Sequence, residues 1–374
     1  MDYLSEIMEI IEGGLQNNPT KVSNYTSLLI KKLEDARDGQ SASRIKKLLS
    51  SKKMLAMSAK SLITKEIPVD SESRIPLAEV MPPEDPEVSF IFLQPAIREQ
   101  IEEYINVLKK EDQLAKYDVN AYKNLLLFGP PGTGKSKTAK YIASQVGLPL
   151  VTVRIDGLIS SYLGSTSKNM KTLFDYVERT PCILFLDEFD AFAKMRDDTN
   201  ELGELKRVVN TLLQNLDSIW GKKSIIAATN HEHLLDPAVW RRFDYKIKLD
   251  LPEKEQRKQM ITRFLGKEMA DLDLDTFIEL TDKMSGAEIE NVCNSLKTST
   301  ALSNKSKITP RDIFLAFIRT QLTSSEVFAE DREVHYAKKL RSSKPQIFNY
   351  RALSEMLGKP LATTYRLLRD DENG

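Results

Sequence analysis

Eight residues at positions 129–136, GPPGTGKS, combine glycines, a lysine and a serine in an order that suits a chain of phosphates. They follow an apolar run, NLLLF, and precede a helix-like run, KTAKYIASQVG. Gly132 and Gly134 let the backbone turn its N–H groups inward around phosphate oxygens, and the start of the following helix favours anions. We expect Lys135 to reach the β and γ phosphates and the Ser136 hydroxyl to bind Mg²⁺. A glycine-rich turn with a chance lysine, the alternative, would lack the flanking strand and helix.

Two acidic residues end a second apolar run, CILFLDE at 182–188. Ligands of open α/β sheets bind at the carboxyl ends of strands, and adjacent strand residues point different ways. We therefore expect Asp187 to face the metal ion, through water, and Glu188 to polarise the water that attacks the γ phosphate. A solvated acidic pair is the alternative. The sequence thus predicts ATP and Mg²⁺ as cofactors, and the predicted nucleotide-binding residues are Gly129, Pro130, Pro131, Gly132, Thr133, Gly134, Lys135 and Ser136.

Four ordered blocks make the chain resemble the AAA family of P-loop ATPases over about Pro95 to Gln321. The blocks are DEFDAFAKMR (187–196), ELKRVVNTLLQNLDSI (204–219), AATNHEHLLDPAVWRRFD (227–244) and SGAEIENVC (285–293). The resemblance implies Mg²⁺-dependent ATP hydrolysis, with Asn230 as the polar residue that contacts the γ phosphate and the attacking water. An amide there can donate to one and accept from the other. The block SGAEIE lacks an arginine that other branches carry, which places the chain with the protein-remodelling branch.

The same resemblance makes Arg241 and Arg242 candidates for an arginine finger, which reaches into a neighbouring subunit's nucleotide. The family usually separates two arginines by a Pro-Gly-like insertion, whereas this chain has WRRFD. We prefer Arg242, directly before Phe243, and assign a surface salt bridge more readily to Arg241. A finger that acts in trans needs a neighbour, and a head-to-tail contact that closes gives a ring. We expect a homohexamer, and leave open whether it forms only with ATP.

The stretch DGLISSYLGST (156–166) places a tyrosine and a leucine among serines, between a strand-like run and a helix-like run. By the resemblance, Tyr162, Leu163 and Gly164 form the loop that lines the central pore of a ring. An exposed apolar pair there would intercalate between the side chains of an extended polypeptide, a contact that does not depend on substrate sequence. The alternative is that Tyr162 packs on its own domain.

Five strand-like runs alternate with helical patterns, and their near-continuous Leu, Ile and Val content indicates a sheet covered on both faces. The runs are Asn124 to Gly129, Leu148 to Ile155, Cys182 to Glu188, Ser224 to Asn230 and Tyr245 to Leu251. The predicted fold is a P-loop NTPase with a parallel five-stranded sheet and helices on both faces. From Pro252 the strands stop and four helical segments follow, with start signals at SGAE (285–288) and TPRD (309–312).

These patterns divide the chain into five parts. Three amphipathic helices fill the first part and either recruit a protein substrate or adaptor or form a structural cap. Prolines 68, 76, 82, 83 and 86 make the second part a linker, because proline removes amide donors and disfavours helix before it. The predicted parts are a helical domain (1–54), the linker (55–90), the large ATPase subdomain (91–251), a small helical lid (252–325) and a C-terminal helix-turn-helix-like segment (330–374).

The C-terminal segment NYRALSEMLGKPLATTYRLLRD (349–370) resembles a helix-turn-helix, with Gly358 at the turn. Between positions 336 and 369 the chain has eight basic residues and one acidic residue. Binding of DNA through the second helix, with Thr363, Thr364 and Arg366 outward, is one hypothesis. Docking of a protein is the other, since many such modules do only that.

The bulk composition limits the partners. The chain has 374 residues, 54 basic and 54 acidic, so no overall field would draw it to nucleic acid or an anionic membrane. No apolar run approaches the roughly 18 residues that span a bilayer, the first residues do not form a secretion signal, and the two cysteines fit a reduced compartment. We expect a cytoplasmic ring motor that remodels protein substrates, or alternatively a DNA-associated ATPase. A nucleotide-gated scaffold without hydrolysis is disfavoured because the catalytic set is complete.

Overall fold

The computed structural model divides into two compact units. The first unit comprises residues 1–91, 96–129 and 135–248, and the second comprises 92–95, 130–134 and 249–374. The residues that the structure describes are 3–15, 19–36, 38–49, 67–70, 73–83, 90–115, 117, 123–154, 158, 163–191, 204–235, 237–266, 273–303, 308–321 and 329–369.

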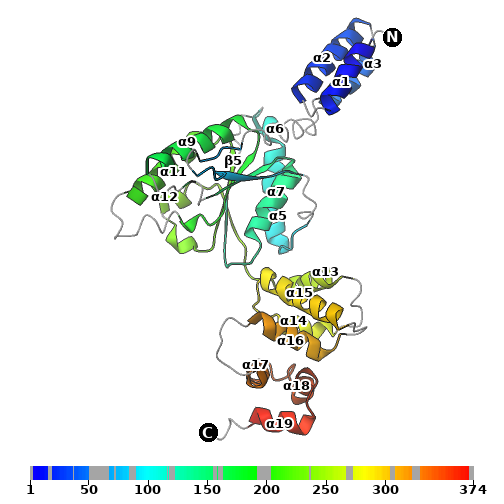
Figure 1. The fold of residues 1–374 in the computed structure, drawn as a ribbon, viewed down its shortest axis with the longest axis vertical. Helices are drawn as coiled ribbons and strands as arrows, with labels where there is room; N and C mark the ends of the chain where they lie inside the picture. Colours follow the sequence, from blue (N-terminus) through cyan, green and yellow to red (C-terminus); the bar gives the residue numbers. More distant parts are fainter. Residues whose placement is uncertain are drawn as a thin grey trace. The chain divides into compact units, whose positions relative to one another are not determined.

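The first unit contains a six-stranded sheet with the strand order β1-β3-β4-β5-β2-β6 (Figure 1). The five predicted strands, β2 to β6, all form and pair in parallel, whereas β1 pairs antiparallel with β3. The P-loop strand β2 therefore lies between β5 and β6. The strands are β1 Ala78–Met81, β2 Asn124–Phe128, β3 Leu150–Val153, β4 Ile183–Leu186, β5 Ser224–Thr229 and β6 Tyr245–Lys248.

The sixth strand lies in the segment that the sequence analysis assigned to a linker, so the predicted count of five was one too few. The strand β1 fits between Pro76 and Pro82 and contains no proline itself. It occupies the edge of the sheet beside β3, where only one side of the strand needs a hydrogen-bonding partner. Its neighbour Leu77 is fully buried, so apolar burial holds the segment in place despite the flanking prolines.

Helices cover both faces of the sheet, with α9 and α11 over one face and α5 and α7 over the other (Figure 1). The predicted helix that begins at Pro95 is confirmed as α5, where the missing N–H of proline costs no hydrogen bond. The helical elements of this unit after the linker are α5 Pro95–Lys109, α6 Glu111–Ala115, α7 Lys135–Val146, α9 Leu163–Arg179, α11 Glu204–Ile219, the 3₁₀ turn η2 Glu232–Leu234 and α12 Pro237–Trp240.

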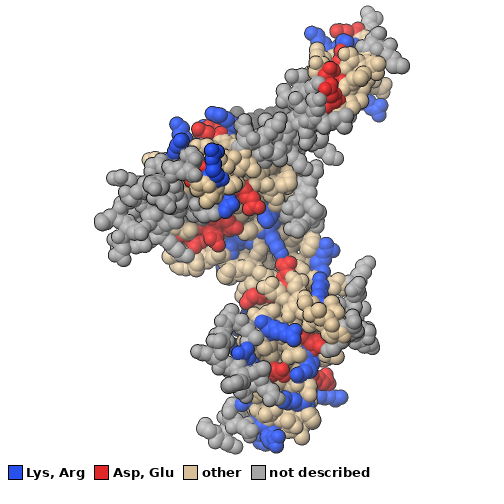
Figure 2. Space-filling view, in the orientation of Figure 1, with Lys and Arg blue, Asp and Glu red and all other residues tan. Residues whose placement is uncertain are grey.

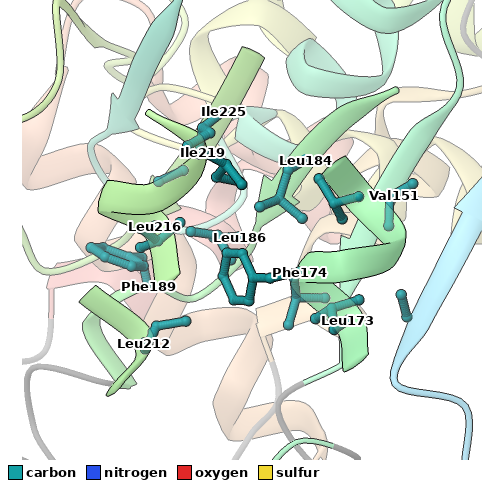
Figure 3. Packing of buried hydrophobic residues seen from close by; sticks show 14 of the residues in the cluster. Val151, Leu173, Phe174, Leu184, Leu186, Phe189, Leu212, Leu216, Ile219 and Ile225 are labelled. Atoms are coloured by element: carbon teal, nitrogen blue, oxygen red, sulfur yellow. The ribbon is translucent and has the colours of Figure 1, made fainter. Parts of the chain in front are cut away.

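Alternate strand residues point to opposite layers, which explains the continuous apolar runs. Leu184, Leu186 and Ile225 face the cluster formed with α9 and α11, in which Phe174 and Leu216 are buried (Figure 3). The intervening residues of the same strands, such as Phe185 and Ile226, are equally buried but lie outside that cluster. Apolar side chains therefore exclude water from both faces of the sheet. The polar residues that follow the strands lie at the carboxyl ends of the strands.

The three predicted N-terminal helices are present as α1 Leu4–Leu15, α2 Pro19–Asp35 and α3 Gly39–Leu49. They pack around Leu29, Ile30, Leu33 and Ala42. A buried carboxylate, Glu6 on α1, accepts a hydrogen bond from Lys32 Nζ on α2 at 2.6 Å. In contrast, α1 leaves a row of apolar side chains exposed: Leu4, Ile7, Met8 and Ile11.

The second unit is all helical, and the four predicted lid helices are confirmed. The predicted start signals are also confirmed, since Ser285 and Glu288 form a capping box and Thr309 N donates to Asp312 Oδ2 at 3.0 Å. The helices are α13 Lys254–Leu265, α14 Leu274–Leu280, α15 Gly286–Leu302, α16 Pro310–Gln321, α17 Ala329–Ser343, α18 Tyr350–Leu357 and α19 Leu361–Arg369. None of the described helices is long and apolar enough to span a membrane.

One apolar cluster runs through the lid helices and the C-terminal helices together. Phe277 and Phe314 from the lid share it with Phe348, Leu353 and Met356, all of them nearly or fully buried. The sequence suggested a separate segment after residue 330. The structure instead shows α17 to α19 built on the lid core.

An ion network reinforces this junction. Lys344 Nζ donates to Glu279 Oε2 at 2.7 Å and lies 2.8 Å from Asp282 Oδ2. Hydrogen bonds from Lys254 and Lys344 lower the pKa of Glu279, and the bond from Lys344 is the largest cause that lowers the pKa of Asp282. Burial opposes the charge of Lys344, but its bonds to Asp282 and Glu279 outweigh burial and raise its pKa. The charged forms of all three groups are therefore favoured in the folded state.

Replacing Lys344 with methionine should destabilise the chain by about 1–2 kcal/mol at pH 7, because hydrogen bonds to charged groups are lost. The two lowered carboxyl pKa values contribute stability above the ordinary carboxyl pKa of about 4. That contribution is lost as the pH falls through the folded-state values, so the difference between the two proteins should shrink below about pH 4. Thermal unfolding of Lys344→Met, with the exposed Lys339→Met as control, measures this. Equal effects of both substitutions would contradict the network.

Candidate functional site

The loop at 129–136 connects β2 to α7 in a conformation that requires glycine. Gly132 and Gly134 have φ values of 73° and 95°, in the left-handed region. A Cβ atom at Gly132 would come within 2.6 Å of Ser285 Oγ, so this position also lacks space for a side chain. Ala287 N donates to Gly132 O at 3.1 Å, which holds the tip of the loop against the start of α15 within the second unit.

Lys135 is buried at the start of α7, with 7% of its surface exposed. Its Nζ donates to Gly129 O at 2.8 Å, so the ammonium group lies inside the loop. Burial lowers its pKa, while Asp187, Asp190 and Glu232 act in the opposite direction. A cation placed this way can exchange a backbone carbonyl for phosphate oxygens, which match its charge better.

The two predicted metal ligands are in direct contact. Ser136 Oγ donates to Asp187 Oδ2 at 2.7 Å, which joins the start of α7 to the end of β4. A hydroxyl and a carboxylate are hard oxygen ligands of the kind that Mg²⁺ prefers, and Mg²⁺ usually takes only one or two protein ligands beside phosphate and water. Among the described residues, no group of three or more His, Cys, Asp or Glu side chains could hold a metal. The adjacent hydroxyl of Ser136 and carboxylate of Asp187 fit a magnesium ion bound together with a nucleotide.

Glu188 lies in a turn with an unusual backbone conformation. Its φ is 49°, uncommon for a residue with a side chain, and its side chain is exposed. The turn is fixed on both sides: Glu188 N donates to Asp187 Oδ1 at 3.0 Å and Phe189 N donates to Ala228 O at 2.8 Å. The turn thus exposes the Glu188 carboxylate to solvent, while the Asp187 carboxylate accepts the hydrogen bond from Ser136.

Asn230 follows β5 directly and lies at the same edge of the sheet. The register pairs Phe128 with Thr229 and Leu186 with Ala227, so β2 and β5 end level and β4 ends two residues earlier. The half-buried Asn230 is one residue beyond this register, opposite the first residue of the phosphate loop. The structure thereby places Gly129, Lys135 and Ser136 at the same edge of the sheet as the two acids and the amide that the sequence analysis selected.

Two residues that the sequence analysis did not single out hold this edge together. Thr229 is fully buried, and its Oγ1 donates to Asp190 Oδ1 at 3.0 Å. The same hydroxyl accepts from His231 N at 3.0 Å, so it orients the chain on both sides of Asn230. The available signal was a third acid, Asp190, which stands between two phenylalanines in the sequence DEFDAF.

The two arginines have different partners in the structure. Arg242 makes a bidentate ion pair, in which Nε and Nη2 donate to the two carboxylate oxygens of Asp217 at 2.8 and 3.0 Å. Arg241 is exposed, and its Nε donates to Pro237 O on its own helix at 3.2 Å. The salt bridge that the sequence analysis assigned more readily to Arg241 is therefore made by Arg242. Which of the two acts as an arginine finger stays a prediction.

Aromatic packing fixes the position of this arginine pair. Phe243 is 1% exposed and meets Phe189 and Trp220 edge to face, with ring centroids 6.0 and 5.6 Å apart. The next residue, Asp244, accepts a hydrogen bond from Asn124 N at the start of β2. The arginines are thereby tied to both the turn after β4 and the phosphate-loop strand.

The predicted pore residues are only partly described. Tyr162 lies outside the described residues. Leu163 and Gly164 are the first two residues of α9, so two of the three residues predicted in a loop belong to the helix backbone. Their side chains are outside the described part of the chain, and the role of all three stays a prediction.

Comparison with known proteins shows that the part of the chain that contains the phosphate loop matches a protein family. Residues 125–251 match "ATPase family associated with various cellular activities (AAA)". The chain is 38% identical over 212 residues to the uncharacterized AAA family ATPase y4kL of Sinorhizobium fredii, covering 56% of this chain and 63% of that protein. It is 31% identical over 284 residues to the proteasome-activating nucleotidase of Methanopyrus kandleri, covering 72% and 64%.

Two further similarities agree. The ATP-dependent zinc metalloprotease FtsH 3 of Sphaerobacter thermophilus is 30% identical over 239 residues, covering 62% of this chain and 49% of that protein. The chain thus spans about half to just under two thirds of the length of these curated relatives. A crystal structure of the FIGL-1 AAA domain in complex with ADP superposes with a TM-score of 0.53 at 22% identity, covering 74% of this chain and 95% of that one. That likeness shows the fold.

Removing the Ser136 hydroxyl should uncouple Mg²⁺ from nucleotide binding. In Ser136→Ala, Asp187 remains but the direct hydroxyl ligand is lost, so addition of Mg²⁺ should no longer strengthen the binding of a fluorescent ATP analogue. The matched control is Thr133→Ala, because the Thr133 hydroxyl donates to Pro130 O inside the loop at 2.9 Å and not toward Asp187. An unchanged response to Mg²⁺ in Ser136→Ala would contradict the assignment.

Proposed function

Residues 125–251 form an ATPase domain of the AAA family, and from this premise we propose that the chain is an ATP-hydrolysing ring motor that remodels protein substrates. The observation that carries the proposal is the contact of Ser136 with Asp187 beside the exposed, strained Glu188. A purely structural loop would have no need to hold two acids and a buried lysine at one edge of a sheet.

The chain's own residues would divide the work at the nucleotide. The loop amides of 129–136 and Lys135 would bind the phosphate chain, since amide N–H groups and a buried cation both favour anions. Ser136 and Asp187 would hold Mg²⁺, which neutralises charge on the β and γ phosphates when bound. These residues position the γ phosphate at the carboxyl ends of β2 and β4.

Glu188 would act on the attacking water. Its exposed carboxylate can accept a proton or a hydrogen bond from water, and its turn is held to β5 by the backbone hydrogen bond from Phe189 N to Ala228 O. Asn230 would orient the same water and the γ phosphate, because an amide both donates and accepts. Asp190 and Thr229 would hold the chain around Glu188 and Asn230 in position through their buried hydrogen bond, without contacting the nucleotide.

Arg241 would complete the site of a neighbouring subunit. An exposed guanidinium is permanently charged and forked, so it suits phosphate oxygens on which charge develops. Arg242 and Asp217 hold the turn that presents it. A residue supplied in trans requires a head-to-tail contact, and a closed ring of six copies is the arrangement we propose.

The substrate would be an extended polypeptide. Two similar proteins are described as a proteasome-activating nucleotidase and an ATP-dependent metalloprotease, and both descriptions suit work on proteins. Tyr162, Leu163 and Gly164 would contact the polypeptide in the pore. The exposed apolar row of α1 supports recruitment of a protein substrate or adaptor by the N-terminal helices.

Complementation between two inactive variants tests the action of Arg241 in trans. Arg241→Ala and Glu188→Gln should each lower ATP hydrolysis by at least about 100-fold. In an equal mixture, a subunit with Glu188 and a neighbour with Arg241 would occur at about one quarter of the sites, so about a quarter of the activity should return. The measurement is phosphate release from each variant and from the mixture.

The controls for this test are Arg242→Ala and Asp217→Asn. Both remove the same ion pair, so they should reduce hydrolysis alike and less severely than Arg241→Ala. Failure of the mixture to regain activity, or a larger loss in Arg242→Ala than in Arg241→Ala, would contradict the assignment.

Substrate grip by Tyr162 is tested with an unfolded protein. Casein should stimulate ATP hydrolysis in the unsubstituted chain, and Tyr162→Ala should bring the stimulated-to-basal ratio close to one because the intercalating ring is lost. Tyr162→Phe, which keeps the ring, should retain stimulation. Equal stimulation of the alanine and phenylalanine variants would remove Tyr162 from the pore.

A further inference from the structure

The last two helices form a tight helix-turn-helix. Asn349 caps α18 by accepting from the backbone N–H groups of Arg351 and Ala352, both at 3.0 Å. Gly358 ends the helix with a φ of 63°, and a Cβ atom there would meet Arg311 Cδ at 2.9 Å. Arg311 also donates to Leu357 O, so the turn is closed against the lid. Three residues then separate α18 from α19.

The two helices differ in what they expose. Helix α18 buries Leu353, Met356 and Leu357, so it serves as the support. Helix α19 leaves most of one face in solvent, and its exposed residues are Leu361, Ala362, Tyr365, Arg366 and Arg369.

Thr364 was predicted to point outward, and this was wrong. It is fully buried, and its Oγ1 reaches Lys359 O at 3.5 Å. A small side chain with its hydroxyl satisfied locally lets α19 approach α18 closely. Arg366, in contrast, is exposed as predicted.

Some basic residues of α17 to α19 and the turns between them are already bonded within the chain. Lys344 is held by Glu279 and Asp282, and Arg341 Nη1 donates to the carbonyl oxygens of Pro345 and Phe348 at 2.7 and 3.5 Å. Arg351, Arg366 and Arg369 are exposed. Figure 2 shows basic side chains over the end of the chain that carries α19. Two of the exposed basic side chains, Arg366 and Arg369, lie on α19, and two more, Lys339 and Arg351, lie on α17 and α18.

A ladder of stacked side chains orders part of this surface. Arg341 lies over the ring of Tyr350 at 4.4 Å, Tyr350 contacts Tyr365 with centroids 4.8 Å apart, and Arg369 lies over Tyr365 at 5.0 Å. The ladder links α17, α18 and α19. A guanidinium that stacks by its face keeps its N–H edge for other partners and loses less entropy when it binds a phosphate.

We propose that the exposed face of α19 binds duplex DNA, with Arg366 and Arg369 on the phosphates at the edges of the major groove. A short exposed helix held by a supporting helix across a tight turn fits the major groove of B-form DNA, about 12 Å wide. The major groove of A-form RNA is too narrow to admit it. The excess of positive charge matches a polyanion. The site goes beyond the proposed motor and does not depend on ATP hydrolysis.

Fluorescence anisotropy with a labelled 24-base-pair duplex of arbitrary sequence tests the proposal on the full chain without nucleotide. We expect a Kd of about 1–100 µM that weakens steeply with salt. Arg366→Gln and Arg369→Gln should each weaken binding several-fold and lower the slope of log Kd against log salt by about 1, since each removes one phosphate contact. The matched control is Arg319→Gln, which removes an exposed arginine from α16 and should change neither value.

Three outcomes would contradict the proposal that α19 binds duplex DNA. One is a slope that is the same in Arg366→Gln, Arg369→Gln and Arg319→Gln. A second is binding of poly-glutamate as tight as that of the duplex and equally sensitive to the two substitutions, since that would make α19 a docking surface for acidic protein. The third is tighter binding of an RNA duplex of the same sequence. Thermal unfolding of each variant confirms that the helices remain folded, and the ATP hydrolysis of the same variants tests the motor separately.

Discussion

The hydrogen bond from Ser136 to Asp187 ties together the two halves of the candidate site. It closes the start of α7 onto the end of β4, and these elements reach one another because the parallel strands β2 and β5 end level and β4 ends only two residues earlier. The same geometry places Lys135 on the carbonyl of Gly129 and leaves Glu188 in a strained turn that faces solvent. A nucleotide with Mg²⁺ would meet residues that are already assembled.

Support for that edge comes from residues that would not touch the nucleotide. Thr229 and Asp190 link the ends of β5 and β4 through a buried hydrogen bond, which would be costly to leave unmade. Phe243 packs between Phe189 and Trp220, and so connects the turn after β4 to the arginine pair. These side chains pack against one another within the first unit, so they form a continuous path by which a structural change beside the γ phosphate can reach Arg241.

Local patterns in the sequence predict the parts of the site that depend on a single segment. The phosphate loop, the acids after β4 and the five parallel strands follow from glycine spacing and apolar runs, which are properties of neighbours in the chain. The strand β1 was missed because prolines flank it, and edge position relieves the constraint that proline imposes. The ion pair of Arg242 could not be foreseen from the sequence, since its partner, Asp217, lies 25 residues away on α11. Similarly, the sharing of one core by the lid and α17 to α19 depends on contacts between distant segments.

The most direct measurement is a structure of the Glu188→Gln chain with ATP and Mg²⁺. The account predicts the β and γ phosphates inside the loop at 129–136 and the metal about 2.1 Å from Ser136 Oγ, with the ion in place of the direct bond between Ser136 and Asp187. A nucleotide bound with Ser136 still on Asp187 and the metal held elsewhere would contradict it.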